Sequence, residues 1–300
     1  MKRPHFSILI SLLLLSASCS LQKAAASAVG GLAWNGQTIL EQESDVEAAR
    51  LNTPPLIASL AVFAENKRDD RHFGALLAKA YGQYAYGFYE EDLLQYSSTD
   101  YHYKESLERA NRFYERGKAY GLRGLSRKSS FHKALTQPIP DFERSLRSFK
   151  KKDVPLLFWT AFCWGGWVNL HRDDPDAIAE FSRVVAMIDR VMELEPTYAS
   201  GSALSFRAVL DASRPPMLGG NPKRAKELFD QAVAVEPRFL MTKVLFAQYY
   251  AVQVQDQKLF VQLLSDVAAA DAAAFPEQRL ANELAKRRAT LLLGKAKLWF

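Results

Sequence analysis

The chain has 300 residues, of which 48% are hydrophobic, and a formal net charge of +6. This length and composition exclude an intrinsically disordered protein and allow a large hydrophobic core. Acidic and basic residues alternate along the chain, and the one basic run, Lys150–Lys152, is interpreted as an exposed loop. We therefore expect no nucleic-acid binding.

The first residues have the layout of a bacterial export signal. A basic start (residues 2–3) precedes an apolar run (6–15), and three small residues (16–18) lead to Cys19. The run is too short to cross a membrane, which takes about 20 apolar residues. Small residues before a cysteine resemble a lipobox, in which the thiol is acylated, although Ser16 stands where leucine is usual.

This interpretation divides the chain into a lipoprotein signal peptide (1–18), a lipidated tether with a first helical segment (19–52) and a helical domain (53–300). It places the protein on a bacterial membrane, facing the periplasm and anchored through Cys19. Ser20 follows the cysteine. Since no aspartate is present there to retain the protein at the inner membrane, we expect the outer membrane. An ordinary signal peptide with a chance cysteine is the alternative.

Helical periodicity dominates the rest of the chain. Thr53 and Pro54 are interpreted as the N-cap and first residue of a helix. Further helices are predicted over 71–96 and 100–125, with a polar connection and a short helix over 126–152. No stretch has the sustained alternation of a β-strand, so the sequence predicts an all-α fold.

Two segments have the spacing of the second helix of a tetratricopeptide repeat, in which a proline follows the helix. The copies consist of Val184, Ile188, Val191 and Pro196, and of Ala225, Phe229, Ala232 and Pro237. After the second copy, Phe246 and Tyr250 occupy packing positions of a following first helix. These matches predict an array of about ten to twelve helices that packs hairpin on hairpin. Such arrays commonly bind a protein or peptide.

Residues suited to catalysis or metal binding are dispersed. The histidines after the expected signal peptide are far apart, and none has metal-ligand spacing to another histidine or to Cys163. We therefore expect no metal, no cofactor and no enzymatic activity. Cys163 lies among aromatic residues and is interpreted as a small buried hydrophobe. The acidic run Glu90–Asp92 is interpreted as a solvated helix end.

One predicted helix is unusually rich in tryptophan. It carries Trp159, Trp164 and Trp167, and at about 100° per residue Trp159 lies nearly opposite Trp164. A helix that is apolar on several sides either lies at the centre of a core or borders an apolar cavity. We consider the three tryptophans and Cys163 as candidate lining of an apolar channel, with core packing as the alternative.

Together these segments resemble the T-components of TRAP transporters, periplasmic tetratricopeptide lipoproteins known as TatT. The resemblance rests on the lipobox-like start, the degenerate repeats, the tryptophan-rich segment 158–169 and the loop 215–222 before the helix at 225–229. It implies a homotrimer with hydrophobic channels that binds the periplasmic solute-binding protein of the transporter (P-component) and handles a hydrophobic ligand. A tetratricopeptide scaffold lipoprotein in cell-envelope assembly is the alternative.

Overall fold

The computed structural model describes residues 28–67 and 70–300; the expected signal peptide and Cys19 lie outside them. The described residues form thirteen α-helices, α2–α14, and no strand, which confirms the predicted all-α array. Residues 28–41, before α2, are also helical. Within the described ranges, no helix is long and apolar enough to cross a membrane.

The first half of the array contains α2 (Val46–Glu65), α3 (Arg71–Tyr84), the π-helix η1 (Ala85–Tyr89), α4 (Glu90–Gln95), α5 (Tyr101–Leu125), α6 (Ser129–Ala134), α7 (Ile139–Leu146) and α8 (Val154–Leu170). The second half contains α9 (Pro175–Leu194), α10 (Tyr198–Ala212), α11 (Pro222–Val235), α12 (Met241–Leu245), the π-helix η4 (Phe246–Ala251), α13 (Gln257–Ala269) and α14 (Arg279–Gly294). Short 3-10 turns η2 (Lys151–Asp153), η3 (Pro216–Leu218), η5 (Ala272–Ala274), η6 (Pro276–Gln278) and η7 (Ala296–Leu298) complete it.

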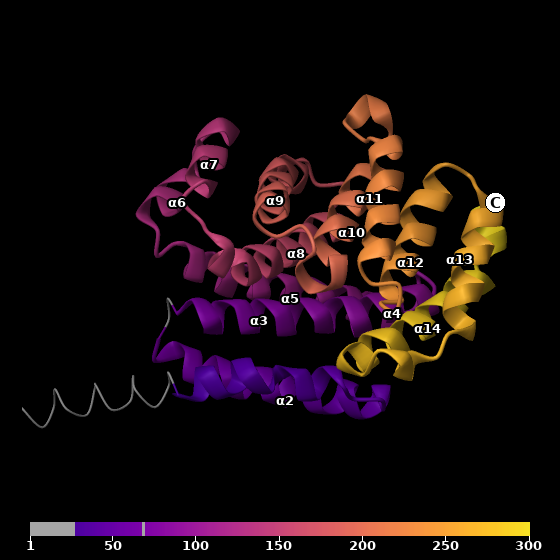
Figure 1. The fold of residues 1–300 in the computed structure, drawn as a ribbon, viewed down its shortest axis with the longest axis horizontal. Helices are drawn as coiled ribbons and strands as arrows, with labels where there is room; N and C mark the ends of the chain where they lie inside the picture. Colours follow the sequence, from indigo (N-terminus) through magenta and orange to yellow (C-terminus); the bar gives the residue numbers. More distant parts are fainter. Residues whose placement is uncertain (1–27, 68–69) are drawn as a thin grey trace, which may run out of the picture.

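The helices pack as hairpins that follow a curved path (Figure 1). Helix α3 packs on α5, both pack on α8, and the hairpins α8–α9 and α10–α11 come next. The path then turns through α12 and α13 until α14 contacts α2. Arg287 of α14 joins these ends, with Nη1 2.7 Å from Oε1 of Glu47 and Nη2 2.8 Å from Oε1 of Glu91. The array therefore closes on itself.

The helical repeat residues of the second copy lie on α11 and pack against α10 and η4. Ala225, Phe229 and Ala232 are fully buried, and the ring of Phe229 stacks on Phe246 with centroids 4.8 Å apart. Tyr250 is half-buried and packs on the Phe246 ring.

The residues of the first copy belong to α9. Val184, Ile188 and Val191 are fully buried in the core that α9 shares with α8. Pro196 and Pro237 each lie two residues after the last residue of α9 and α11. Each copy therefore forms the second helix of a hairpin, and a proline ends the hairpin because it cannot continue the helical hydrogen bonding.

The predicted helix start at Thr53 is wrong. Helix α2 begins at Val46, because the side chain of Asp45 accepts hydrogen bonds from the N–H groups of Glu47 and Ala48 and so caps it. Pro54 lies inside this helix, and the boundary expected at residue 53 falls within α2.

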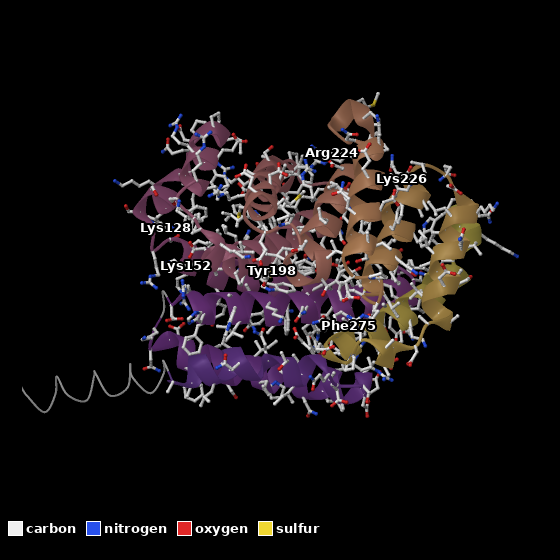
Figure 2. All side chains as sticks on the ribbon, viewed as in Figure 1. Lys128, Lys152, Tyr198, Arg224, Lys226 and Phe275 are labelled. Atoms are coloured by element: carbon white, nitrogen blue, oxygen red, sulfur yellow. The ribbon has the colours of Figure 1, made fainter. Side chains whose placement is uncertain are left out.

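Figure 2 shows Lys152 of the basic run toward the left end of the molecule, and Arg224 and Lys226 of α11 in the upper part, right of centre. Lys150, Lys151 and Lys152 are exposed. Lys151 pairs with Glu195, with Nζ 3.1 Å from Oε1. These lysines are therefore solvated.

Candidate functional site

The closed array surrounds a cavity of about 890 Å³. Its wall includes residues from the helix at 28–41, from α2, α3 and η1, from α8 to α10, and from α12 and α14. Helices from both ends of the sequence thus border one space, which exists because α14 reaches back to α2. A volume of 300–1,000 Å³ is typical of sites for small organic molecules.

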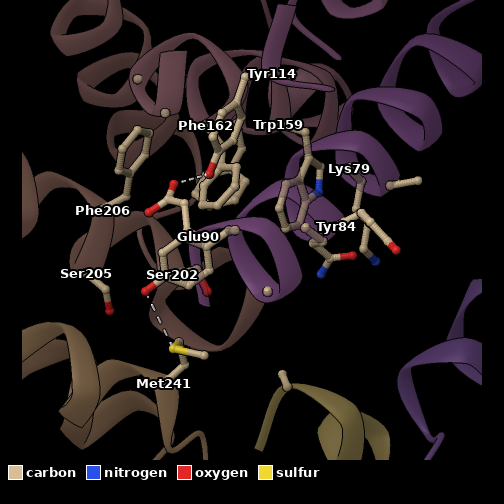
Figure 3. A pocket seen from close by; sticks show the side chains of 18 of the residues that line it. Lys79, Tyr84, Glu90, Tyr114, Trp159, Phe162, Ser202, Ser205, Phe206 and Met241 are labelled. Atoms are coloured by element: carbon tan, nitrogen blue, oxygen red, sulfur yellow. Dashed lines mark hydrogen bonds between the residues drawn. The ribbon is translucent and has the colours of Figure 1, made fainter. Parts of the chain in front are cut away.

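Aromatic rings form the wall along α8 and α10 (Figure 3). The ring of Phe162 lies 5.8 Å from Phe206 and 5.5 Å from Trp159, between centroids. Gly166 lets the Tyr114 ring lie directly on the α8 backbone, because an added Cβ would stand 2.4 Å from that ring. The wall is therefore apolar and closely packed.

Of the four residues expected to line a channel, the structure brings Trp159 to the cavity. Its side chain is 8% exposed, and Nε1 donates to the Tyr198 hydroxyl at 3.2 Å. The Nζ of Lys79 lies 5.7 Å from the centroid of the Trp159 ring. Trp159 thus presents an apolar face to the cavity while its polar atom is satisfied.

The other three residues point elsewhere from α8. Cys163 is fully buried against α3, where its thiol donates to the Ala78 carbonyl at 3.1 Å, and burial raises the pKa of this thiol. Trp164 is buried in the core. The Trp167 ring packs on His171 at 4.6 Å, outside the cavity wall. The distribution follows from the helical rotation, which sends successive side chains to different faces.

The expectation that Glu90–Asp92 would be a solvated helix end is wrong. All three side chains are buried, and each meets an arginine from a distant part of the sequence: Glu90 meets Arg288, Glu91 meets Arg287 and Asp92 meets Arg50. These arginines lie on α14 and α2. A buried carboxylate requires such pairing, and the sequence did not reveal which arginines would supply it.

Glu90 and Tyr114 are polar residues of the wall that sequence reasoning missed. The Tyr114 hydroxyl donates to Oε1 of Glu90 at 2.5 Å (Figure 3). Nη2 of Arg288 lies 3.7 Å from Oε2 of Glu90. Burial raises the pKa of the Glu90 carboxyl, and the Arg288 charge and the Tyr114 hydrogen bond oppose that rise. Burial, with the nearby Glu90 charge, also holds the pKa of Tyr114 well above its usual value.

Besides Glu90, charged residues border the cavity at two places. Near Trp159, Lys79 forms an ion pair with Glu41 and donates to Oε1 of Gln37 at 2.7 Å. At the other place, Arg172 and Arg214 border the cavity after the ends of α8 and α10. Throughout residues 28–67 and 70–300, no three His, Cys, Asp or Glu side chains are grouped so that they could hold a metal ion.

One family model, described as TRAP transporter T-component (TAtT), matches residues 42–300. The match includes every helix from α2 to α14 and thus most of the cavity wall. No curated protein matches the sequence.

Proposed function

Because the chain belongs to the family of TRAP transporter T-components, we propose that it binds the periplasmic solute-binding protein of such a transporter and holds an apolar ligand in its cavity. The chain is thus an accessory of a transporter, and its own contribution is to shelter a poorly soluble solute. An apolar molecule that enters a cavity lined by aromatic rings leaves water, which is favourable in free energy.

The observation that supports this proposal is the predominantly apolar cavity of about 890 Å³. A scaffold whose helices served only to present outer surfaces would gain nothing from such a space, because an empty apolar cavity lowers stability. Helical arrays also present long surfaces to proteins, which is consistent with a second binding surface for the solute-binding protein.

A blocked cavity tests ligand binding. Ser202 borders the cavity and donates to the carbonyl oxygen of Ala199, so Ser202→Trp would place a large ring in the space. Ser59 on α2 makes the corresponding bond to Pro55 but is exposed, which makes Ser59→Trp the matched control. We expect Ser202→Trp to abolish binding of the neutral fluorescent probe N-phenyl-1-naphthylamine and Ser59→Trp to preserve it. Equal binding by both variants contradicts the proposal.

Cross-linking in intact cells, followed by identification of captured proteins, tests the partner. Recovery of a periplasmic solute-binding protein supports the transporter role. Recovery of envelope-assembly proteins alone supports the scaffold alternative.

We further propose that the protein is a homotrimer anchored to the outer membrane through Cys19, as the family and the lipobox-like start imply. Cys19→Ala should move the protein from the membrane to the soluble periplasmic fraction. Light scattering of the purified Cys19→Ala protein should give the mass of a trimer. A variant that stays membrane-bound, or a monomer at micromolar concentration, would contradict the respective part of this proposal.

A further inference from the structure

The guanidinium group of Arg214 borders the apolar cavity without a partner for its charge. It forms no hydrogen bond and no ion pair with any described residue, and it lies 3.4 Å from the centroid of the Phe181 ring. Burial lowers the pKa of this guanidinium, and no neighbouring carboxylate opposes that effect. A guanidinium has five N–H donors, so all of them are free to bind an anion.

A second arginine borders the cavity at the same end. Arg172 donates from Nε to the carbonyl oxygen of Asn169 at 3.1 Å, and both Nε and Nη2 bond its side-chain oxygen. It forms no ion pair with any described residue. Its charge also acts on Glu90, but that carboxylate already accepts from Tyr114 and pairs with Arg288.

The topology places these two arginines together. Short connections make α8, α9 and α10 successively antiparallel, so the C-terminal ends of α8 and α10 and the N-terminal end of α9 lie at one end of the layer. Arg172 follows α8, Arg214 follows α10, and Phe181 beneath Arg214 lies in the second turn of α9. This end of the cavity therefore carries two lining arginines that form no ion pair with any described residue: Arg214 is half-buried, and Arg172 is exposed and is followed in the chain by Asp173 and Asp174.

At the opposite end the bordering cation is paired: Lys79 forms an ion pair with Glu41, beside Trp159. Between the two ends the cavity follows α8 from Trp159 to Asn169, a length of about 15 Å at the helical rise per residue. An elongated apolar space with cationic groups at one end matches a molecule that has a chain and a charged head.

We infer that the ligand is an amphipathic anion, with an apolar chain along α8 and a carboxylate or phosphate head bound by Arg214 and Arg172. This inference rests on the proposed function, because it assigns a chemical class to the ligand of the same cavity. Guanidinium groups bind both kinds of head through paired N–H donors. An uncharged ligand of equal length would leave those donors unused.

Displacement of N-phenyl-1-naphthylamine tests the inference with four probes of one chain length: hexadecanoate, hexadecyl phosphate, hexadecan-1-ol and hexadecyltrimethylammonium. The whole chain is used with Cys19→Ser, so that no covalent lipid competes. We expect at least one anion to bind about tenfold or more tightly than the alcohol, and the cation most weakly. The comparison of the two anions distinguishes a fatty acid from a phospholipid-like head.

Substitutions of the two arginines test where the charged head group of the ligand binds. Arg214→Gln should weaken anion binding about tenfold and leave alcohol binding within about twofold, while Arg214→Lys keeps the charge and should retain most of the affinity. The double variant Arg214→Gln, Arg172→Gln should bind the anion more weakly than Arg214→Gln alone. Arg144→Gln on α7 removes an exposed arginine of a surface ion pair and is the matched control.

The outcomes separate the two proposals. If the alcohol and the anions bind equally and Arg214→Gln changes neither, the head-group inference is wrong and the apolar cavity still functions. If none of the four probes displaces the dye, the proposed function itself is wrong. Unchanged alcohol binding by Arg214→Gln also shows that the variant is folded.

Discussion

The hydroxyl of Tyr84 donates a hydrogen bond to the carbonyl oxygen of Arg50 at 2.9 Å. In a regular α-helix that carbonyl would accept from the N–H of residue 54, which Pro54 does not have. A side chain of α3 therefore replaces the hydrogen bond that proline removes from the interior of α2. This substitute bond lets α2 continue through Pro54 beside the cavity.

A double-mutant cycle tests this relationship. Tyr84→Phe should lower the free energy of unfolding by about 1–2 kcal/mol, because it leaves a half-buried carbonyl without a donor. In the Pro54→Ala background the helix regains its own N–H, so the same change should cost less. Urea denaturation of the four proteins measures the coupling. If Tyr84→Phe lowers the free energy of unfolding equally in both backgrounds, the hydroxyl does not compensate for the N–H that Pro54 lacks.

The same tyrosine predicts a dependence on alkaline pH. Burial raises the pKa of Tyr84 from 10.0 to about 12, and the nearby Tyr89 adds to the shift. A raised pKa in the folded state stabilises the protein fully below pH 10, and this stabilisation is lost as the pH rises toward 12. Between those values, the unfolding free energy should fall less steeply in Tyr84→Phe than in the unaltered protein. If the unfolding free energy of the two proteins falls equally steeply with pH, this pH dependence does not come from Tyr84.

Gly166 is required where the Tyr114 ring lies on α8. Gly166→Ala places a Cβ 2.4 Å from that ring and should lower the free energy of unfolding by about 1–3 kcal/mol through overpacking. Gly36, in the helix at 28–41, has nothing within 4 Å of an added Cβ. Gly36→Ala is thus the control and should stabilise the protein by about 0.5–1 kcal/mol. Thermal unfolding of the two variants should shift in opposite directions.

Phe229 is fully buried and stacks on Phe246 between two repeat units. Phe229→Ala should cost about 3–5 kcal/mol, because it removes a large apolar side chain and leaves a cavity. Phe63 on α2, which is 40% exposed, gives the control substitution Phe63→Ala and should cost far less. A loss below about 1 kcal/mol for Phe229→Ala in chemical denaturation would mean that the repeats do not pack through this ring.

The sequence predicted the helical array because its signals are local. The spacing of Val184, Ile188 and Val191 and the prolines after α9 and α11 depend only on residues within one or two helical turns. The start of α2 was misjudged because the pair Thr53–Pro54 is itself a good helix-start signal. What overrides it is the Asp45 cap together with a hydroxyl supplied by α3.

The cavity could be predicted only in part, for the same reason. A tryptophan-rich helix indicated that α8 is apolar on several sides, and Trp159 does border the cavity. The helical pattern could not distinguish that face from the one buried against α3, where Cys163 lies. The pairing of Glu90 with Arg288 joins residues from η1–α4 and α14, and no local pattern encodes a contact over that separation.

The contact of Arg287 with Glu47 has a consequence for the order of assembly. Helix α2 comes early in the chain and α14 near its end, yet both helices border the same cavity. The first hairpins can stack before the rest of the chain has folded, because each needs only its neighbours. The cavity wall is complete only when α14 has packed against α2, so the cavity forms in the last step of assembly.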